Sequence, residues 1–437
     1  PGQVASFVVE DPPAQPPQEP GPRGLLARAR SHLVDLTPLR TSRDFRRLFT
    51  GKSVSDFGDE IIIVVVPFQI WSLTHSTLAV GLLGLCELVP VFVFPIVGGA
   101  VADAVERRRM VIITHVLLTL MSILMAVNAL QPVPRLWPLY VFATLSAGMY
   151  TFNRPAVSTW PARLLPAELL PSSNALEAGF GTLASMAGPA LAGVLIALIH
   201  PAGAFLVDAG TFVVVVVAVF RMSPSPPTVD APRVNLEAIV DGFRFLKGKH
   251  SIQSVFALDL NAMVFGFPVA LFPAIAARLG HGPSVLGLLY AAPAAGAFLA
   301  TAFSGQARHV RRQGRAIMLS VLVWGGAIVA FGFSPWLWLS LLMLTIAGLG
   351  DMVSGIFRTT ILQTAVEDRY RGRLDGIGMA VWATGPAIGS VESGVVASLS
   401  SVSFSVVSGG VLCILGVGLI HLLNPRFDRY DARHAVA

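Results

Sequence analysis

Runs of about 20 apolar residues constrain this chain more than any other feature, because each run is long enough to cross the hydrocarbon core of a bilayer as a helix. Twelve such windows follow one another between residues 53 and 423. We expect spans at about 53–73, 78–101, 110–130, 137–160, 175–199, 203–221, 252–277, 284–306, 316–333, 336–362, 376–399 and 402–423. A chain that is 54% hydrophobic and 13% charged is too apolar for ordinary soluble domains. The sequence therefore predicts an all-α membrane protein with twelve transmembrane helices.

The positions of the basic residues give an independent test, because Lys and Arg gather in the cytoplasmic loops of membrane proteins. Of the 31 basic residues, 27 fall before the first window, after the last, or in every second loop. Arg135 and Arg278 lie in the opposite loops, and Arg154 and Arg358 fall inside windows. This alternation predicts that both termini are cytoplasmic. The basic pI of about 9.8 then reflects orientation in the membrane, so we do not expect a nucleic-acid partner.

The two halves of the chain repeat the same features in the same order. Gly99 precedes Arg109 by the same ten residues that separate Gly305 from Arg315, each time at the end of the second window of a half. "GPALAG" at 188–193 is echoed by "GPAIGS" at 385–390. Such internal repeats are typical of transporters. We therefore expect two pseudo-symmetric six-helix bundles.

This symmetry divides the chain into five regions. Residues 28 to 50 are basic and amphipathic, which favours a surface position at the inner leaflet with Phe45, Leu48 and Phe49 turned inward. The predicted regions are a disordered and amphipathic cytoplasmic tail (1–44), an N-terminal bundle (45–221), a cytoplasmic linker with a surface helix (222–250), a C-terminal bundle (251–423) and a cytoplasmic C-terminal tail (424–437).

The segment "GAVADAVERRR" resembles the loop signature that follows the second helix in the major facilitator superfamily. Gly99, Asp103, Arg107 and Arg108 match that signature, whereas Ala104 and Glu106 depart from it. "LTHSTLAVGLLG", "GFRFL" and "RGRLDGIG" are similar to the branch that contains the enterobactin exporter and related multidrug efflux proteins. The resemblance implies that the four matching residues form a conformational latch. The alternative is that the arginines only fix the topology.

Acidic residues inside apolar windows are candidates for proton coupling. Asp56, Asp59 and Glu60 share one helical face, and an ionised acid at bilayer depth costs about 2.5 to 3.5 kcal/mol on insertion scales. That face should point inward, unless the helix enters the membrane only at Ile61. The acids expected to take part in coupling are Asp59, Glu60, Glu87, Asp351 and Glu392. Three further acids, Glu177, Asp208 and Asp259, lie nearer helix ends and are expected to be structural or solvated.

Substrate contacts are expected from side chains that could line a central cavity. The candidates are Arg154, Arg358, Phe265, Phe267 and Trp382. The resemblance implies that helices 1, 4, 7 and 10 surround this cavity and bring Asp59, Arg154 and Asp351 together. Snorkelling of the arginines and packing of the aromatic rings are the alternatives.

One proline lies in the expected fifth helix of each half. Pro189 and Pro386 each follow a glycine, Gly188 and Gly385, and each proline frees the carbonyl group four residues earlier. We expect both helices to bend there. The alternative is tight packing through small residues, without a role in transport.

These features favour a secondary transporter that exports a small amphipathic molecule, a siderophore or a drug, by proton antiport with alternating access. We expect it in the bacterial inner membrane as a monomer, with a small-molecule substrate, protons and lipid as partners. A proton-independent facilitator or importer is the alternative. The sequence has no metal-ligand spacing, phosphate-binding loop or nucleophile elbow, so neither a cofactor nor a metal is expected and an enzyme is disfavoured.

Overall fold

A computed structural model describes residues 35–224, 244–280, 282–302, 305, 309–366 and 368–431. Side chains are described within these ranges except at residues 92, 93, 95–104, 155, 368, 369, 371–373, 375 and 379. All regular structure in the described ranges is helical. The predicted linker helix in 222–250 lies largely outside them.

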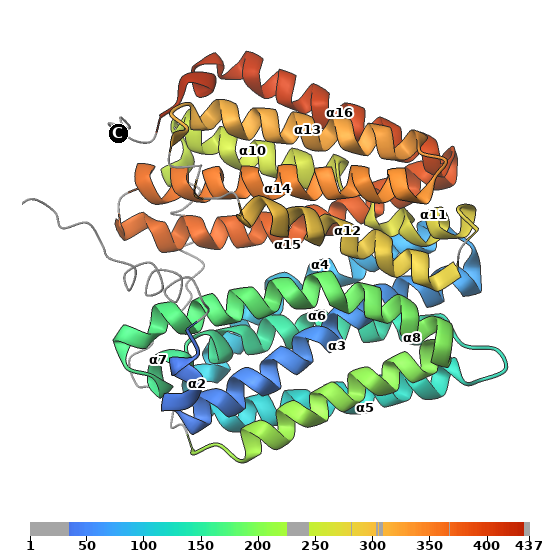
Figure 1. Cartoon of the computed structure of the whole chain (residues 1–437), viewed down its shortest axis with the longest axis vertical. Coiled ribbons are helices and arrows are strands. Elements are labelled where there is room, and N and C mark those ends of the chain that lie inside the picture. Colours follow the sequence, from blue (N-terminus) through green and yellow to red (C-terminus); the bar gives the residue numbers. More distant parts are fainter. Residues whose placement is uncertain are drawn as a thin grey trace, which may run out of the picture.

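The first part of the chain forms the lower group of helices in Figure 1. Its elements are α2 (Thr37–Thr41), α3 (Arg43–Thr74), α4 (Thr77–Ala104), α5 (Arg107–Ala129), α6 (Trp137–Ser158), α7 (Pro161–Leu164), η1 (Ala167–Leu169) and α8 (Leu170–Phe220). Helix α8 contains two of the expected spans. Its backbone is non-helical at His200, with φ 59° and ψ 169°, immediately before Pro201.

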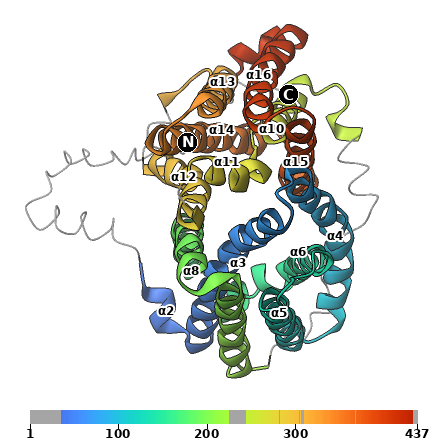
Figure 2. The ribbon, with the colours of Figure 1, turned by 90° about the vertical axis from the view of Figure 1, so that its right-hand side faces the viewer.

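The second part forms the upper group. Its elements are α10 (His250–Phe265), η2 (Val269–Leu271), α11 (Phe272–Arg278), α12 (Gly282–Ala302), α13 (Gln313–Phe333), α14 (Leu337–Ala365), α15 (Asp368–Leu399), α16 (Val402–Leu423) and η4 (Pro425–Arg429). Figure 2 shows the two groups viewed roughly down their helix axes. The groups meet where α8 packs against α12 and where α4 packs against α15.

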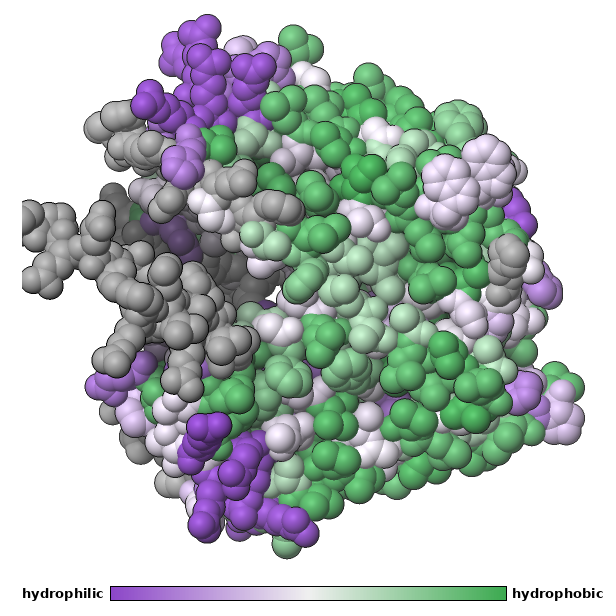
Figure 3. All heavy atoms as spheres, viewed as in Figure 1, coloured by the Kyte–Doolittle hydropathy of each residue, from purple (hydrophilic) through white to green (hydrophobic). Residues whose placement is uncertain are grey.

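Eight helical segments in the described part of the chain are long and apolar enough to cross a membrane. Figure 3 shows apolar side chains over most of the visible face, with hydrophilic side chains gathered at the end where η4 and α2 lie. We call this end, with residues 42, 221 and 424, the terminal end. The opposite end, with residues 75, 200, 282 and 401, is the distal end.

The first long helix begins earlier than the sequence indicates. Helix α3 starts at Arg43, where Ser42 Oγ accepts a hydrogen bond of 3.1 Å from the Phe45 amide and so caps the helix. Phe45 and Phe49 are buried against Leu165. Residues 28 to 50 were expected to lie along the inner leaflet, but from Arg43 onward they belong to α3, and these aromatic rings continue its packing. Their inward direction is confirmed.

Glycines let neighbouring helices approach closely, and Gly348 of α14 shows how little room remains. A Cβ atom at this position would overlap the main chain of Pro293 in α12, with its Cα only 2.7 Å away. Gly326 of α13 has open space at the same atom. Close approach of this kind is the usual function of small residues between membrane helices.

We predict that Gly348→Ala lowers the thermal unfolding midpoint of the protein in detergent by several degrees. The matched control, Gly326→Ala, should leave it unchanged or raise it, since Ala gains about 0.5–1 kcal/mol over Gly in a helix. Differential scanning fluorimetry measures both variants. Equal midpoints would show that α12 and α14 are not in the described contact.

Candidate transport site

Arg358 of α14 lies between two carboxylates from different helices. Its guanidinium forms ion pairs with Asp259 of α10, through Nη1, and with Asp351 of α14, through Nη2 at 3.5 Å. The side chains of Arg358 and Asp259 are only 13% and 12% exposed, whereas that of Asp351 is 37% exposed. The group therefore holds one cation and two acids, and carries a net negative charge when both acids are ionised.

Asp259 was expected to be structural or solvated, and its burial excludes the solvated alternative. Helix α10 begins only at His250, but Asp259 faces inward toward α14 and is buried with Arg358. The sequence spacing indicates that Asp259 corresponds to Asp56 of the first half. Arg358 follows Asp259 by 99 residues, and Arg154 follows Asp56 by 98.

The helix contacts show the same correspondence. A Cβ on Gly188 would lie 2.5 Å from Cβ of Glu60, and a Cβ on Gly385 would lie 2.6 Å from Cβ of Met263. Glu60 on α3 and Met263 on α10 are thus equivalent positions in the two halves. Four residues earlier, Asp56 corresponds to Asp259.

The two halves use these equivalent acids differently. Asp56 forms an ion pair of 2.9 Å with Lys52, one turn away on α3, instead of with an arginine. Arg154 on α6 is exposed, and its charge acts on the Tyr150 hydroxyl together with the charges of Asp56 and Asp59. Both Arg154 and Asp59 are therefore within electrostatic range of Tyr150, without a direct contact between them among the described residues. Among the described residues, no ion pair links Asp351 to either of them.

The remaining candidate acids lie on other helices. Glu60 is half-buried beside Gly188, and the charge of Glu87 on α4 acts on Tyr290 of α12, which belongs to the other half. Glu392 on α15 is half-buried. Glu87 is therefore close to the junction of the two groups of helices.

The candidate aromatic residues are divided between packing and exposure. Phe265 and Phe267 flank the end of α10 and pack against the hydrophobic core, and the Phe267 ring meets Trp324 edge-on with centroids 6.4 Å apart. Trp382 on α15 is 57% exposed. The Trp382 ring is thus exposed in this conformation, whereas the two phenylalanine rings pack against neighbouring side chains.

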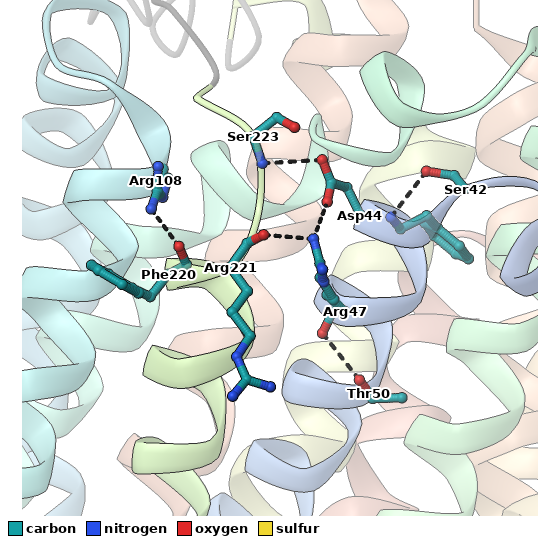
Figure 4. A network of polar contacts seen from close by, with 9 residues as sticks. Ser42, Asp44, Arg47, Thr50, Arg108, Phe220, Arg221 and Ser223 are labelled. Carbon is teal, nitrogen blue, oxygen red and sulfur yellow. Dashed lines mark hydrogen bonds and ion pairs between the residues drawn. The ribbon is translucent and has the colours of Figure 1, made fainter.

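Arg108 contacts the end of α8 within its own half. Its guanidinium donates to the Phe220 carbonyl and lies 5.4 Å from the centroid of the Phe220 ring. Figure 4 shows that Arg47 donates to the next carbonyl, that of Arg221, at 2.5 Å, while Asp44 accepts from the Ser223 amide at 3.1 Å. These contacts join α3, α5 and the C-terminus of α8.

The structure describes the surroundings of only some of the other residues of the predicted latch. Gly99 and Asp103 lie in the last turns of α4, and their surroundings are outside the described residues. Arg107 is buried at the start of α5. The latch across the two halves therefore stays a prediction.

At the distal end, two glycine contacts join the halves. In the first, a Cβ on Gly193 of α8 would lie 3.1 Å from the Gly287 Cα of α12. In the second, a Cβ on Gly394 of α15 would lie 3.0 Å from the Gly81 Cα of α4. Both contacts leave no room for a larger side chain, so the two halves are packed together at this end.

The two prolines are close to these contacts. The Pro189 carbonyl would collide with a Cβ on Gly287, and Pro386 precedes Ala387, whose carbonyl would collide with a Cβ on Gly84. Neither α8 nor α15 is interrupted at its proline. The expected bends stay predictions. The distal contacts were not predicted, because the sequence does not show which glycines face a neighbouring helix.

A bundle of long apolar helices with a buried ion pair, that of Arg358 and Asp259, is typical of a multi-pass integral membrane protein. A family model described as transmembrane secretion effector matches residues 34–435. The chain belongs to this family of the major facilitator superfamily. It is a membrane transporter, as are its relatives, and not an enzyme.

Curated relatives are similar over nearly their whole length. The chain is 30% identical over 396 residues to the enterobactin exporter EntS of Citrobacter koseri, which covers 90% of this chain and 95% of the relative. The corresponding protein of Shigella flexneri is 30% identical over 397 residues, with the same coverage.

Solved structures show the same fold. A bacterial homologue of the human lysosomal transporter Spinster, inward-facing and unoccupied, has a TM-score of 0.70 at 15% identity, covering 88% of this chain and 97% of that one. An inward-facing bacterial homologue of ferroportin has a TM-score of 0.66 at 18% identity, covering 89% and 99%.

We predict that Arg358→Gln destabilises the protein by about 3–5 kcal/mol, because it leaves the buried carboxylate of Asp259 without its cation and also removes the ion pair of the more exposed Asp351. The unfolding midpoint in detergent measures the loss. Adding Asp259→Asn to this variant should restore part of it, since one of the stranded charges is removed. Strictly additive losses in the double variant would contradict the ion pair.

Proposed function

We propose that this protein exports a small amphipathic molecule, of the siderophore class exemplified by enterobactin, in exchange for protons. The observation that carries the proposal is Arg358 held between Asp259 and Asp351. The similarity to enterobactin exporters supports the cargo class. We further propose twelve spans in two six-helix bundles, a monomer in the bacterial inner membrane and both termini in the cytoplasm.

Protonation of Asp351 is the step that would drive the exchange. With both acids ionised, the group of Asp259, Arg358 and Asp351 has a charge of −1, and one proton makes it neutral. Neutralisation loosens the hold of Asp351 on Arg358 and removes a charge from an apolar interior. Asp351 is the more exposed of the two acids, so it is the one that water reaches first.

The arrangement of the halves supports alternating access. The distal contacts Gly193–Gly287 and Gly81–Gly394 close one end of the molecule. The basic residues of the terminal end support our proposal that this end is the cytoplasmic side. Substrate would then load from the cytoplasm in this conformation. Rocking of the halves requires these glycine contacts to separate.

We predict that everted membrane vesicles containing the protein accumulate enterobactin when their interior is acidified. For one proton, a gradient equivalent to 100 mV is worth about 2.3 kcal/mol, which sustains roughly fortyfold accumulation. Asp351→Asn should abolish the accumulation although the variant still reaches the membrane.

The matched control is Glu168→Gln, which removes an exposed acid outside the long helices. It should transport as the unaltered protein does. Accumulation that does not respond to the imposed pH gradient in the unaltered protein would favour a proton-independent facilitator instead.

We also predict that Gly287→Val opens the distal end, because the added side chain cannot fit against Pro189 and Gly193. The reporter is Thr77→Cys in a background of Cys86→Ser and Cys413→Ala, since Thr77 is buried where α4 meets α15. A membrane-impermeant maleimide should label this cysteine faster in the Gly287→Val protein. The control is Gly418→Val, a position with open space. Equal labelling rates would contradict distal closure by these contacts.

A further inference from the structure

Asp208 is the most completely enclosed acid in the described part of the chain. It lies on the second half of α8, has no solvent exposure, and faces both α3 and α5. Ser122 of α5, also fully buried, donates a hydrogen bond of 2.5 Å to its Oδ2 atom. Its Oδ1 atom is buried without a hydrogen-bond partner. Of the two roles expected for Asp208 from the sequence, structural or solvated, its burial excludes the solvated one.

The backbone of α3 closes the space beside Oδ1. A Cβ atom on Gly58 would lie 2.9 Å from Oδ1, so the absence of a side chain at Gly58 lets the acid fit. The nearby Thr211 hydroxyl donates instead to the Asp208 carbonyl, at 2.7 Å. Oδ1 is thus directed at the helix that carries Asp59, the next residue after Gly58.

The charged and titratable groups around Asp208 do not neutralise it. From α3, the charge of Asp208 acts on Asp59, whose other charged neighbours are Asp56, Glu60 and Lys52. Lys52 is already paired with Asp56. From α5, His115 packs edge-on against Phe212 of α8, with ring centroids 5.8 Å apart. Among the described residues, Asp208 forms no ion pair.

An ionised carboxylate in this position would be buried with one hydrogen bond and no cation, and a second acid lies close by. Both conditions disfavour the charged form. Two interacting acids titrate as a pair, because ionising one makes ionisation of the other more costly. A single proton can therefore satisfy the site, and its position on one acid or the other depends on the surroundings of each.

We propose that Asp208 carries a proton in this conformation and exchanges it with Asp59, so that the two acids form a second proton site inside the N-terminal half. This inference rests on the proposed proton antiport. In the exchange, the O–H bond on Asp208 breaks and an O–H bond on the Asp59 carboxylate forms, with no other reactant. Asp59, which is half-buried, then connects the enclosed acid to water.

The first test detects the proton itself and needs no substrate. Infrared spectroscopy of the protein in proteoliposomes at neutral pH should show a carbonyl band of a protonated carboxylic acid that is absent from Asp208→Asn. The control, Glu168→Gln, should retain this band. Identical bands in the unaltered protein and in Asp208→Asn would overturn the proposal.

Ser122→Ala provides a second variant in case Asp208→Asn does not fold. Losing this hydrogen bond removes stabilisation from the ionised form, so the titration of the band should move to higher pH by about one unit. An unchanged titration would contradict the contact on which the proposal depends.

The second test asks whether the proton takes part in transport, with enterobactin as the probe. In proteoliposomes, Asp208→Asn should retain exchange of labelled for unlabelled enterobactin but lose accumulation driven by a pH gradient. Loss of both activities would indicate a structural role, and retention of both would show that the proton is a spectator; either result overturns the proposal. Failure of antiport itself is recognised separately, because the unaltered protein would then show no driven accumulation, whatever its infrared spectrum.

Discussion

The cost of an uncompensated charge in an apolar interior governs the arrangement of this protein. Arg358 is buried because Asp259 and Asp351 supply opposite charges on two sides, and the three side chains depend on one another. Such a group stabilises little by itself, since desolvation offsets much of the Coulomb attraction. In the exchange that we propose, however, a single proton neutralises its net charge. A transporter needs this property, because a small chemical change must alter which of two packings is favoured.

The two halves have equivalent positions for the central charges but use them differently. Asp259 pairs with Arg358 across two helices, whereas the equivalent Asp56 pairs with Lys52 on its own helix. Arg154 consequently remains exposed, near Tyr150. In the C-terminal half, an ion pair thus joins two helices, α10 and α14. In the N-terminal half, the enclosed acid Asp208 of α8 faces α3 and α5 and has no cation as partner among the described residues. This difference between the two halves underlies the different roles that we propose for them in transport.

Hydrophobic runs and loop charges were enough to predict an all-helical membrane protein, since both follow directly from the bilayer. The superfamily was indicated only by the resemblance of short motifs such as "GAVADAVERRR". The hydrophobic runs also located Asp351 and Arg358, which stand out as charges in apolar windows. They did not show that Asp208 and Asp259 are buried, because the distance of a residue from a helix end does not indicate which neighbouring helix covers its side chain. The distal contacts through Gly81 and Gly287 were missed for the same reason. The start of α3 was misplaced because its capping residue, Ser42, lies in a basic segment that resembles a surface helix.

The most direct test of the central claim is thermodynamic. Enterobactin flux through the protein in proteoliposomes can be measured while the pH gradient is varied against a fixed, opposing enterobactin gradient. If protonation of the buried acids is coupled to transport, the enterobactin gradient at which net flux vanishes will move in step with the imposed pH gradient. If net flux vanishes only when enterobactin is equal on both sides, at every pH gradient, the acids do not couple protons to transport and the account is contradicted.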